Sequence, residues 1–525
     1  MKKILILLAV FIAYSGLQAA EISLWPKNTK DLKKWNAPAQ MWEKDDSGNY
    51  ILVVKNDQPG AGTLIEHKLD LEKYRGYALA VSVEIKADNV SKPEPPWLGI
   101  KFMMPHTTAG VTTWLSATDG RHGSHDWKPY ELSMNISPFL DSAVINLGLQ
   151  ASTGEVRFRN LKAKLIPPDV LRPMPYKLPD DFKCEYSPAV KNRPVRRGAM
   201  FQIPALITEK DIRDFAAWGG NLIRWQFQTY KPYDMKYYHQ VLDESLAKLK
   251  KLEPLLKELD VKVIFDMHET PGGRLGSPAV LGTAGGTAVL DGSSCMRIFV
   301  DDFCLNEYIN VWKKIAAALK DSGIIWGYEL LNEPTAAGQK TKYHYLLAQY
   351  EAAKEIRKID PETPIIVESD EWANPSTFSY LSPLPLKNII YAFHFYEPGP
   401  YTHQGTSSAT MEEVKKGNLR KYPSKTFDKN SLRKTVMPIQ DFANRYHAQV
   451  VCSEFSVIRW APGAEQWLED VISIFEENNW NWTYHAFREW HGWSVEHDSD
   501  WRNENPVNYN TKRKEILLEH FKKQR

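Results

Sequence analysis

Two different spacings of hydrophobic residues divide the chain. In residues 77–86, YALAVSVEIK, apolar side chains occupy every second position, and residues 144–150, VINLGLQ, repeat the alternation. A period of two places successive side chains on opposite faces of a strand, with one face buried. Further strands are expected at 50–56, 62–70, 97–104, 127–136 and 154–166. Residues 21–166 are therefore predicted to form an all-β sandwich of the jelly-roll type.

From about residue 195 the pattern changes to a repeated order of apolar run, loop and amphipathic helix. Residues 238–259 and 306–321 carry apolar side chains at helical spacing. The expected strands are 196–201, 221–226, 261–268, 324–332, 364–369, 388–396, 449–455 and 482–487. Eight strands alternating with helices predict an α/β domain, a (β/α)8 TIM barrel over residues 195–525. The alternative, a doubly wound sheet, would need a glycine-rich phosphate turn after its first strand, and the sequence has none there.

A proline-rich passage separates the two patterns. It begins PPDVLRPMPYKLPDD, residues 167–181. Proline fixes φ and lacks an N–H group, so it stiffens an extended chain and does not serve in interior strands. We interpret residues 167–194 as a semi-rigid linker.

The N-terminus has the pattern of a targeting segment. Residues 1–20, MKKILILLAVFIAYSGLQAA, combine two lysines, an apolar run and small residues at the end. This pattern is typical of a secretory signal peptide, and the apolar run is short for a membrane span. We expect cleavage near residue 20 and a secreted or periplasmic protein with no membrane contact in its mature form. A retained membrane anchor is the alternative.

Composition narrows the function classes. With 66 Lys and Arg against 64 Asp and Glu, the formal net charge is +2, which gives no electrostatic reason to expect a nucleic acid partner. The 18 Trp and 24 Tyr residues exceed what a core requires, and flat aromatic rings suit the faces of sugars. A large barrel core rich in aromatics would explain them equally well. We expect the protein to act as a monomer.

The four cysteines permit disulfides in an exported protein without requiring them. Cys295 and Cys304 lie close together in the chain and could pair. Cys452 lies within an apolar strand, where a buried free thiol is expected.

The predicted barrel strands end in polar side chains. These are Arg224, His268, Asn332, Glu333, His394, Tyr396, Glu454 and His485. A single such residue would be read as a solvated strand end. Six strands that end this way predict one shared cleft, because the active site of a (β/α)8 barrel lies at the C-terminal ends of its strands.

Two of these groups are glutamates. Hydrolysis of a glycosidic bond uses two carboxyl groups, one protonated to assist the leaving oxygen and one ionised to attack or support the anomeric carbon. Hydrogen bonds and positive charge keep a carboxyl ionised, and we expect Tyr396 and Arg224 to do so for Glu454. We expect Asn332 to bind a sugar hydroxyl beside the bond being cut.

At this point the motifs resemble those of glycoside hydrolase family 5, a family of retaining (β/α)8 glycosidases. The matching motifs are GGNLIRW (219–225), IFDMHETPGG (264–273), LLNEP (330–334), FHFYEP (393–398) and VVCSEFSV (450–457). The resemblance implies that Glu333 is the acid/base and Glu454 the nucleophile. It also implies an oligo- or polysaccharide substrate, such as a β-glucan or β-mannan, and no cofactor or metal. It assigns substrate binding to Arg224, His268, Asn332, His394 and Tyr396.

The last strand departs from the family pattern. The family ends strand eight with a tryptophan under the sugar, whereas this chain has His485 in WTYHAFREWHGW. Either His485 lines the subsite, or Trp490 or Trp493 reaches in from the following loop. We assign His485 and Trp490 to substrate binding. A metal site built from His485, His491 and His497 is disfavoured, because their spacing fits neither face of a helix or strand.

The predicted sandwich resembles jelly-roll carbohydrate-binding modules, with TGEVRFRNLKAKL (153–165) similar to their closing strand. Trp97, Trp114 and Trp127 could stack on a sugar or could belong to the core. A glycine-rich segment after strand three, residues 271–295, is expected to be a loop at the cleft, and endo and exo action both remain open.

Two other functions fit parts of the sequence. One is a non-catalytic carbohydrate-binding protein on a barrel scaffold, which the presence of both glutamates disfavours. The other is metal-dependent hydrolysis, which would need a ligand cluster that the sequence does not display.

Overall fold

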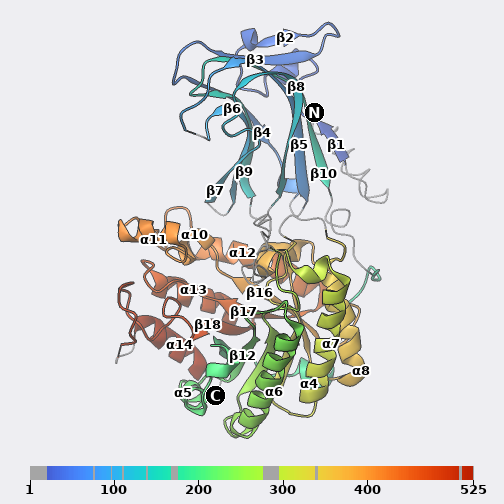
Figure 1. Ribbon diagram of the computed structural model, residues 1–525, viewed down its shortest axis with the longest axis vertical. Helices are drawn as coiled ribbons and strands as arrows, with labels where there is room; N and C mark the ends of the chain where they lie inside the picture. Colours follow the sequence, from blue (N-terminus) through green and yellow to red (C-terminus); the bar gives the residue numbers. More distant parts are fainter. Residues whose placement is uncertain are drawn as a thin grey trace. The chain divides into compact units, whose positions relative to one another are not determined.

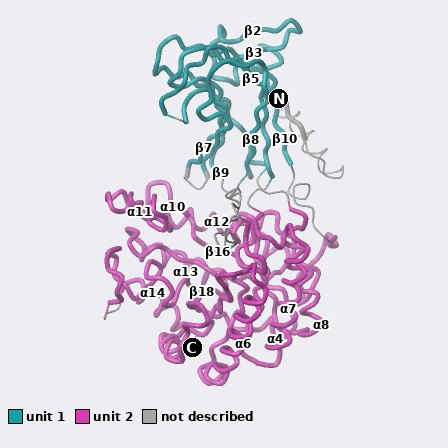
Figure 2. Tube along the Cα trace, viewed as in Figure 1, with its two compact units in different colours: residues 1–173 teal, residues 174–525 magenta. Residues whose placement is uncertain are grey.

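The computed structural model describes residues 20–74, 77–95, 97–108, 111–136, 140–166, 176–275, 295–336, 341–507 and 511–523. The chain divides into two compact units, residues 1–173 and 174–525 (Figure 2). Almost all of the predicted signal peptide and most of the glycine-rich loop, residues 276–294, lie outside the described residues. Among the helices of the described ranges, none has the length and apolar character that crossing a membrane requires.

The N-terminal unit consists of two antiparallel sheets (Figure 1). One has the order β2-β3-β10-β5-β8 with β1 paired to β10, and the other has the order β4-β9-β6-β7. The strands are β1 (Ala20–Ser23), β2 (Trp42–Lys44), β3 (Tyr50–Asn56), β4 (Gly62–Leu69), β5 (Ala78–Val90), β6 (Gly99–Thr108), β7 (Val111–Ser116), β8 (Gly123–Asn135), β9 (Leu140–Gln150) and β10 (Gly154–Ile166). The predicted all-β domain is confirmed. The sequence missed β1, β2 and β7, which are too short or too polar for a period of two to stand out.

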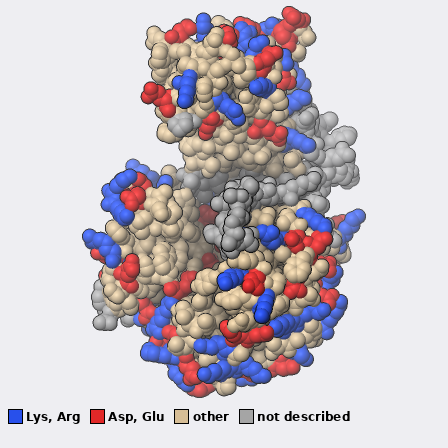
Figure 3. All heavy atoms as spheres, viewed as in Figure 1, with Lys and Arg blue, Asp and Glu red and all other residues tan. Residues whose placement is uncertain are grey.

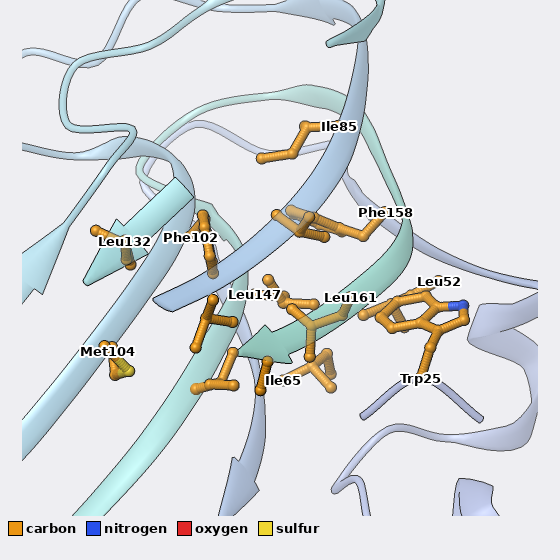
Figure 4. Close-up of a cluster of buried hydrophobic side chains, with 14 of the residues drawn as sticks. Trp25, Leu52, Ile65, Ile85, Phe102, Met104, Leu132, Leu147, Phe158 and Leu161 are labelled. Atoms are coloured by element: carbon orange, nitrogen blue, oxygen red, sulfur yellow. The ribbon is translucent and has the colours of Figure 1, made fainter. Parts of the chain in front are cut away.

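The alternating residues of this unit form its core. Leu79, Val81, Val83 and Ile85 of β5 are all buried, and they join a cluster that continues through β9 and β10. Figure 4 shows part of the cluster, including Phe102, Leu147 and Phe158. Removing such side chains from water is the main force that joins two sheets.

The three tryptophans singled out in this unit have different surroundings. Trp97 and Trp114 are 61% and 68% exposed. Trp127 lies beneath the guanidinium group of Arg159, 4.1 Å from the ring centre. Glycan binding by this unit stays a prediction.

The second unit contains a closed barrel of eight parallel strands in chain order. The strands are β11 (Arg197–Phe201), β12 (Leu222–Phe227), β13 (Lys262–Met267), β14 (Ile325–Glu329), β15 (Ile365–Glu368), β16 (Ile389–Phe395), β17 (Gln449–Phe455) and β18 (Asn481–Phe487). The predicted (β/α)8 fold is confirmed, and each strand lies where the apolar runs placed it, within three residues at either end. Continuous apolar runs locate these strands because both faces of a parallel sheet are covered.

The second unit also contains helices, of which the first in the chain precedes β11 and the others follow barrel strands. They are α4 (Pro188–Lys191), α5 (Glu209–Ala217), α6 (Met235–Glu258), α7 (Asp302–Leu319), α8 (Tyr345–Ile359), α9 (Asp370–Ala373), α10 (Gly399–Thr402), α11 (Ser408–Lys415), α12 (Lys429–Tyr446), α13 (Ala464–Glu477) and α14 (Lys512–Lys522). The two helices expected from periodicity correspond to α6 and α7. Both begin a few residues before the apolar pattern, because Asp234 and Asp301 cap them by accepting N–H groups of the first turn. A short helix, α2 (Thr29–Leu32), belongs to the first unit.

The described end of the predicted linker contacts the barrel. The Tyr186 hydroxyl donates to the Ile389 carbonyl at 2.8 Å and accepts the Gln449 N–H at 2.7 Å. Arg193 donates to the Trp326 carbonyl at 2.6 Å. Ile389 and Gln449 begin β16 and β17, and Trp326 is the second residue of β14, so this part of the chain packs at the N-terminal end of the barrel.

Two expectations from composition can be followed in the structure. All four cysteines, Cys184 included, are free thiols, so Cys295 and Cys304 do not form the disulfide that their spacing would allow. On the visible face of each unit, Lys and Arg side chains are interspersed with Asp and Glu (Figure 3).

Candidate active site

Polar side chains lie directly above an apolar layer inside the barrel. The layer consists of Leu222, Ile264, Trp326, Ile366, Ile390, Ala392 and Val451. The next residue facing the same side of a strand is two positions further on. On four of these strands that position is charged or titratable and buried, and the residues are Arg224, Asp266, Glu368 and His394. The alternation that builds the core therefore also carries four charged or titratable groups to one level of the barrel.

An open cavity of about 410 Å³ lies at the C-terminal ends of the barrel strands. Its lining comes from β16, β17 and β18 and the segments that follow β14, β15, β16 and β18. The lining residues are Glu333, Glu371, Trp372, Asn374, Pro375, His394, Tyr396, Glu397, His403, Glu454, His485 and Trp493. Five of them, Glu333, His394, Tyr396, Glu454 and His485, are residues that the sequence predicts for the site.

Arg224 organises the charges beneath this cavity. The guanidinium group is fully buried, and its polar contacts are Glu329 Oε2 at 2.6 Å, Glu454 Oε2 at 2.7 Å, Asn332 Oδ1 at 2.8 Å, Asp266 Oδ2 at 3.2 Å and Glu368 Oε1 at 3.3 Å. Burial alone would lower the pKa of Arg224, but the surrounding carboxylates raise it well above its usual value. One permanent positive charge thus faces four acidic side chains.

Replacing Arg224 with methionine is expected to lower the free energy of unfolding by about 3–5 kcal/mol, because buried carboxylates would lose their counter-charge. The penalty should be larger at pH 7 than at pH 3. The pKa of Glu454 is held well below 4.5 in the folded protein. Its ionised form therefore stabilises the fold above the unfolded pKa, and this contribution is lost as the pH falls through the folded pKa.

The measurement is urea unfolding at both pH values. Arg213→Met is the matched control, because the ion pair of Arg213 with Glu258 is exposed on both sides, and such pairs contribute about 0–1 kcal/mol. Equal losses in the two variants would contradict a structural role for Arg224.

Glu454 is surrounded by donors. Besides Arg224, the Tyr396 hydroxyl donates to Glu454 Oε1, and His485 Nδ1 lies 3.2 Å from the same oxygen. Burial favours the neutral acid, but the positive charges of His485, His394 and Arg224 outweigh burial and hold the pKa of Glu454 well below its usual value. Glu454 is therefore ionised across the neutral range.

Glu333 has a different environment. Its Oε1 lies 3.0 Å from His394 Nδ1, and its backbone N–H donates to Glu368 Oε2 at 2.7 Å. Burial raises the pKa of Glu333, and the charge of Glu454 raises it further. The hydrogen bond and charge of His394 lower it by more, so the pKa of Glu333 is below its usual value. The carboxyl of Glu333 thus shares a proton site with a neighbouring imidazole, whereas Glu454 is held as an anion.

His485 lies between two carboxylates. Its Nε2 is 2.8 Å from Glu489 Oε2, and its Nδ1 is 2.6 Å from the Tyr396 hydroxyl. Burial lowers the pKa of His485, yet the charges of Glu454 and Glu489 raise it to about 10. At the position where the family resemblance leads us to expect a tryptophan, this chain therefore has a protonated histidine that Glu489 holds in place.

Several predicted residues support the site from outside the described cavity lining. His268 Nδ1 contacts Asp266 Oδ2 at 2.9 Å, and Asn332 Oδ1 accepts from Arg224. Trp490 does not line the described cavity. Its ring packs against Trp460 and Trp493, with centroids 6.1 and 5.7 Å away, and Trp493 is the ring that faces the cavity.

Sequence reasoning missed the buried acids Asp266, Glu329 and Glu368 as well as Glu489. The first three were hidden inside apolar strands, although Asp266 and Glu368 lie two positions beyond apolar residues of the barrel layer. The rim residue Trp372 was also missed. It is 44% exposed, and it lies in a left-handed segment with φ of 50° at Glu371 and 60° at Trp372.

Two sets of side chains have spacing that a metal ion could use. Within each set the potential ligand atoms lie within 4.8 Å of one another, and the sets are Glu329, Glu368 and His394, and Glu333, His394 and Glu454. We assign no metal to either set. Arg224 pairs with three of these carboxylates and His394 with Glu333, so the same atoms already make charge-assisted contacts.

The barrel part of the chain is similar to known proteins. Residues 191–490 match the profile of the family Cellulase (glycosyl hydrolase family 5). Endoglucanase C of Acetivibrio thermocellus is 24% identical over 295 residues, which cover 52% of this chain and 81% of that protein. Cellodextrinase A of Ruminococcus flavefaciens is 22% identical over 280 residues, covering 52% of this chain and 76% of that protein.

Among solved structures, Cel5A of Thermotoga maritima in complex with a mannotriose substrate matches 63% of this chain and 100% of its own length. Its TM-score is 0.48 and its identity 21%. A cellobiose complex of Cel5A from Pseudomonas stutzeri matches 62% of this chain and 92% of its own, with a TM-score of 0.44 and 20% identity.

Proposed function

The chain belongs to the cellulase family, glycosyl hydrolase family 5, and we propose that this glycoside hydrolase cleaves β-glucan with retention of anomeric configuration. Glu454 is the proposed nucleophile and Glu333 the proposed acid/base. One observation carries this proposal: oxygens of the two carboxyl groups lie within 4.8 Å of each other in the same cavity. Retaining glycosidases place their carboxyl groups roughly 5–5.5 Å apart, whereas inverting ones need roughly 6.5–9.5 Å to admit a water molecule.

In the first step Glu454 attacks the anomeric carbon while Glu333 gives a proton to the glycosidic oxygen. The bond to the leaving sugar breaks, and a glycosyl ester forms on Glu454. In the second step Glu333 takes a proton from water, whose oxygen attacks the same carbon and releases Glu454 as a carboxylate. The two inversions restore the β configuration.

The charges around the site support this exchange of roles. While Glu454 is ionised, its charge raises the pKa of Glu333, but His394 lowers that pKa by more, so the proton that the first step uses is held by the Glu333–His394 pair. Formation of the ester removes that charge, so the pKa of Glu333 falls and the group becomes a base for the second step. His394, 3.0 Å from Glu333, is the neighbouring site that exchanges the proton.

The wall of the sugar site is proposed to combine stacking and polar contacts. Trp493 lines the cavity and lies 5.6 Å from His485, ring centre to ring centre. A charged imidazole is a poor stacking surface for a sugar but a good partner for a carboxylate. We therefore assign stacking on the sugar to Trp493, and positioning of the Glu454 carboxylate to His485 and Tyr396.

The substrate class is proposed from the relatives, which are named as endoglucanase and cellodextrinase, and from the family. Reducing-sugar release should be measured on soluble cellulose derivatives, mannan, xylan, xyloglucan and laminarin. We expect the fastest hydrolysis on the cellulose derivative, with mannan as the second substrate. Proton NMR of the first product should show the β anomer. No release on any of these glycans, or an α anomer appearing first, would contradict the proposal.

Action as a monomer stays a prediction. Export is proposed on the pattern of residues 1–20. The same hydrolytic activity should then occur outside the cytoplasm of the native host, on a chain that begins near residue 21. A full-length chain confined to the cytoplasm would contradict export.

A further inference from the structure

Glu368 is a buried acid that the reaction steps described above do not use. It ends β15 with an exposed fraction of 0%. Its backbone is fixed by Gln349 of α8, whose side chain accepts the Glu368 N–H at 3.0 Å and donates to the Glu368 carbonyl at 3.1 Å. From this fixed backbone the Glu368 carboxyl extends toward Glu333 and accepts its backbone N–H.

The two oxygens of Glu368 have different partners. Oε2 accepts the backbone N–H of Glu333 at 2.7 Å. Oε1 lies 3.2 Å from His394 Nε2 and 3.3 Å from Arg224 Nη2. The other nitrogen of His394, Nδ1, lies 3.0 Å from Glu333 Oε1. Glu368 therefore reaches Glu333 twice, directly at its backbone and through the imidazole at its carboxyl.

The backbone of Glu333 requires such support. Its φ is +51°, in the left-handed region that non-glycine residues rarely adopt. The surroundings must hold a residue in this conformation, and here they hold it from both sides. Glu368 accepts the Glu333 N–H. The Arg274 guanidinium donates to the Glu333 carbonyl at 2.9 Å and to the Asn332 carbonyl at 3.1 Å.

The charge of Glu368 also acts on the proton beside Glu333. Burial lowers the pKa of His394, but Glu368, Glu454 and Glu333 together raise it well above its usual value. Burial raises the pKa of Glu368 itself to about 7, against the opposing charge of His394. A proton on the imidazole is thus held between two carboxyls, one of which is the proposed acid/base.

We propose that Glu368 is a positioning residue for the acid/base, which it serves by fixing the left-handed backbone of Glu333 and by orienting His394 against the Glu333 carboxyl. This inference rests on the proposed role of Glu333. Glu368 does not line the described cavity, and two of its contacts lead to Glu333, so we expect its main effect on steps in which Glu333 moves a proton.

The test compares two aryl β-cellobiosides in Glu368→Gln. Phenol is a poor leaving group and needs protonation, whereas 2,4-dinitrophenol leaves without it. The ratio kcat/KM reports the first step alone. We expect kcat/KM on the phenyl substrate to fall about 100-fold, the lower end of what general acid catalysis contributes, and on the dinitrophenyl substrate to fall less than about 5-fold. A second variant, Glu368→Asp, keeps the charge and should recover part of the loss on the phenyl substrate.

Glu329→Gln is the matched control. Glu329 is equally buried and pairs with Arg224 at 2.6 Å, but within the described residues no hydrogen bond or ion pair joins it to Glu333 or His394. Removing its charge should alter both substrates by the same factor. Equal losses on both substrates in Glu368→Gln, or activity unchanged in it, would overturn the proposal. Thermal unfolding of each variant identifies a general loss of folding.

Glu333→Ala on the same two substrates separates this inference from the proposed function. If the loss of kcat/KM depends on the leaving group in Glu333→Ala but not in Glu368→Gln, only the positioning role of Glu368 fails. If Glu333→Ala itself does not discriminate, the acid/base assignment fails.

Discussion

Glu454→Gln is expected to lower kcat on β-glucan by about 10⁵-fold, a loss of about 7 kcal/mol of transition-state stabilisation. The amide cannot form the glycosyl ester, so both steps of the reaction are lost together. The amide oxygen can keep either the Arg224 contact made at Oε2 or the Tyr396 and His485 contacts made at Oε1, but the NH2 group accepts neither. A loss from unfolding must therefore be measured separately from the loss of the nucleophile.

The measurement is initial rate on the best glycan of the panel and on 2,4-dinitrophenyl β-cellobioside, with thermal unfolding as the control for folding. A good leaving group helps little, because the missing element is the nucleophile. If Glu454→Gln kept activity within about tenfold of the parent protein on the activated substrate, Glu454 would not be the nucleophile. That result would instead fit loss of an acid, which contributes roughly 10²–10⁴-fold on substrates that need a proton.

Glu333→Ala is expected to have the second largest effect, and one of a different kind. On β-glucan the leaving sugar needs a proton, so kcat should fall by about 10³-fold. On the dinitrophenyl substrate kcat/KM should stay close to that of the parent protein, because the first step then needs no acid. The second step still lacks its base, so the glycosyl ester should accumulate and appear as a burst of dinitrophenol.

Azide provides the confirming experiment for Glu333→Ala. A small anion needs no base to attack the glycosyl ester, and the shortened side chain leaves room for it. We expect azide to restore turnover on the dinitrophenyl substrate and to yield the β-glycosyl azide, since two inversions still occur. Rescue confined to a Glu454 variant, or an α-glycosyl azide from Glu333→Ala, would reverse the two assignments.

The two expected results depend on a difference in environment that the sequence indicated only in part. The residue types at the strand ends predicted two carboxyl groups, and they predicted that Arg224 and Tyr396 would favour ionisation of Glu454. The structure brings both donors to Glu454 and adds the His485 side chain, which Glu489 holds. His485 lies in β18 and Glu489 follows that strand, so their contact depends on how the chain turns after the strand.

Trp490 illustrates the limit of prediction for loops. The residues after β18 contain Trp490 and Trp493, and their identities give no reason to prefer one as the ring facing the cavity. The chain turns so that Trp493 faces the cavity while Trp490 packs on Trp460. The sequence does not encode that choice locally, because it depends on Trp460, which lies 30 positions earlier in a different loop.

The sequence by itself determined the barrel, its eight strands and the two glutamates, because hydrophobic periodicity and polar strand ends are local properties of the chain. Only the tertiary structure decided which acids meet. Asp266, Glu329 and Glu368 are single polar residues within apolar strands, far apart in the chain. Closure of the barrel sets them around Arg224 and places Glu368 against the backbone of Glu333. Such contacts depend on the register of neighbouring strands, and register is set by the packing of the whole barrel and not by any one of its segments.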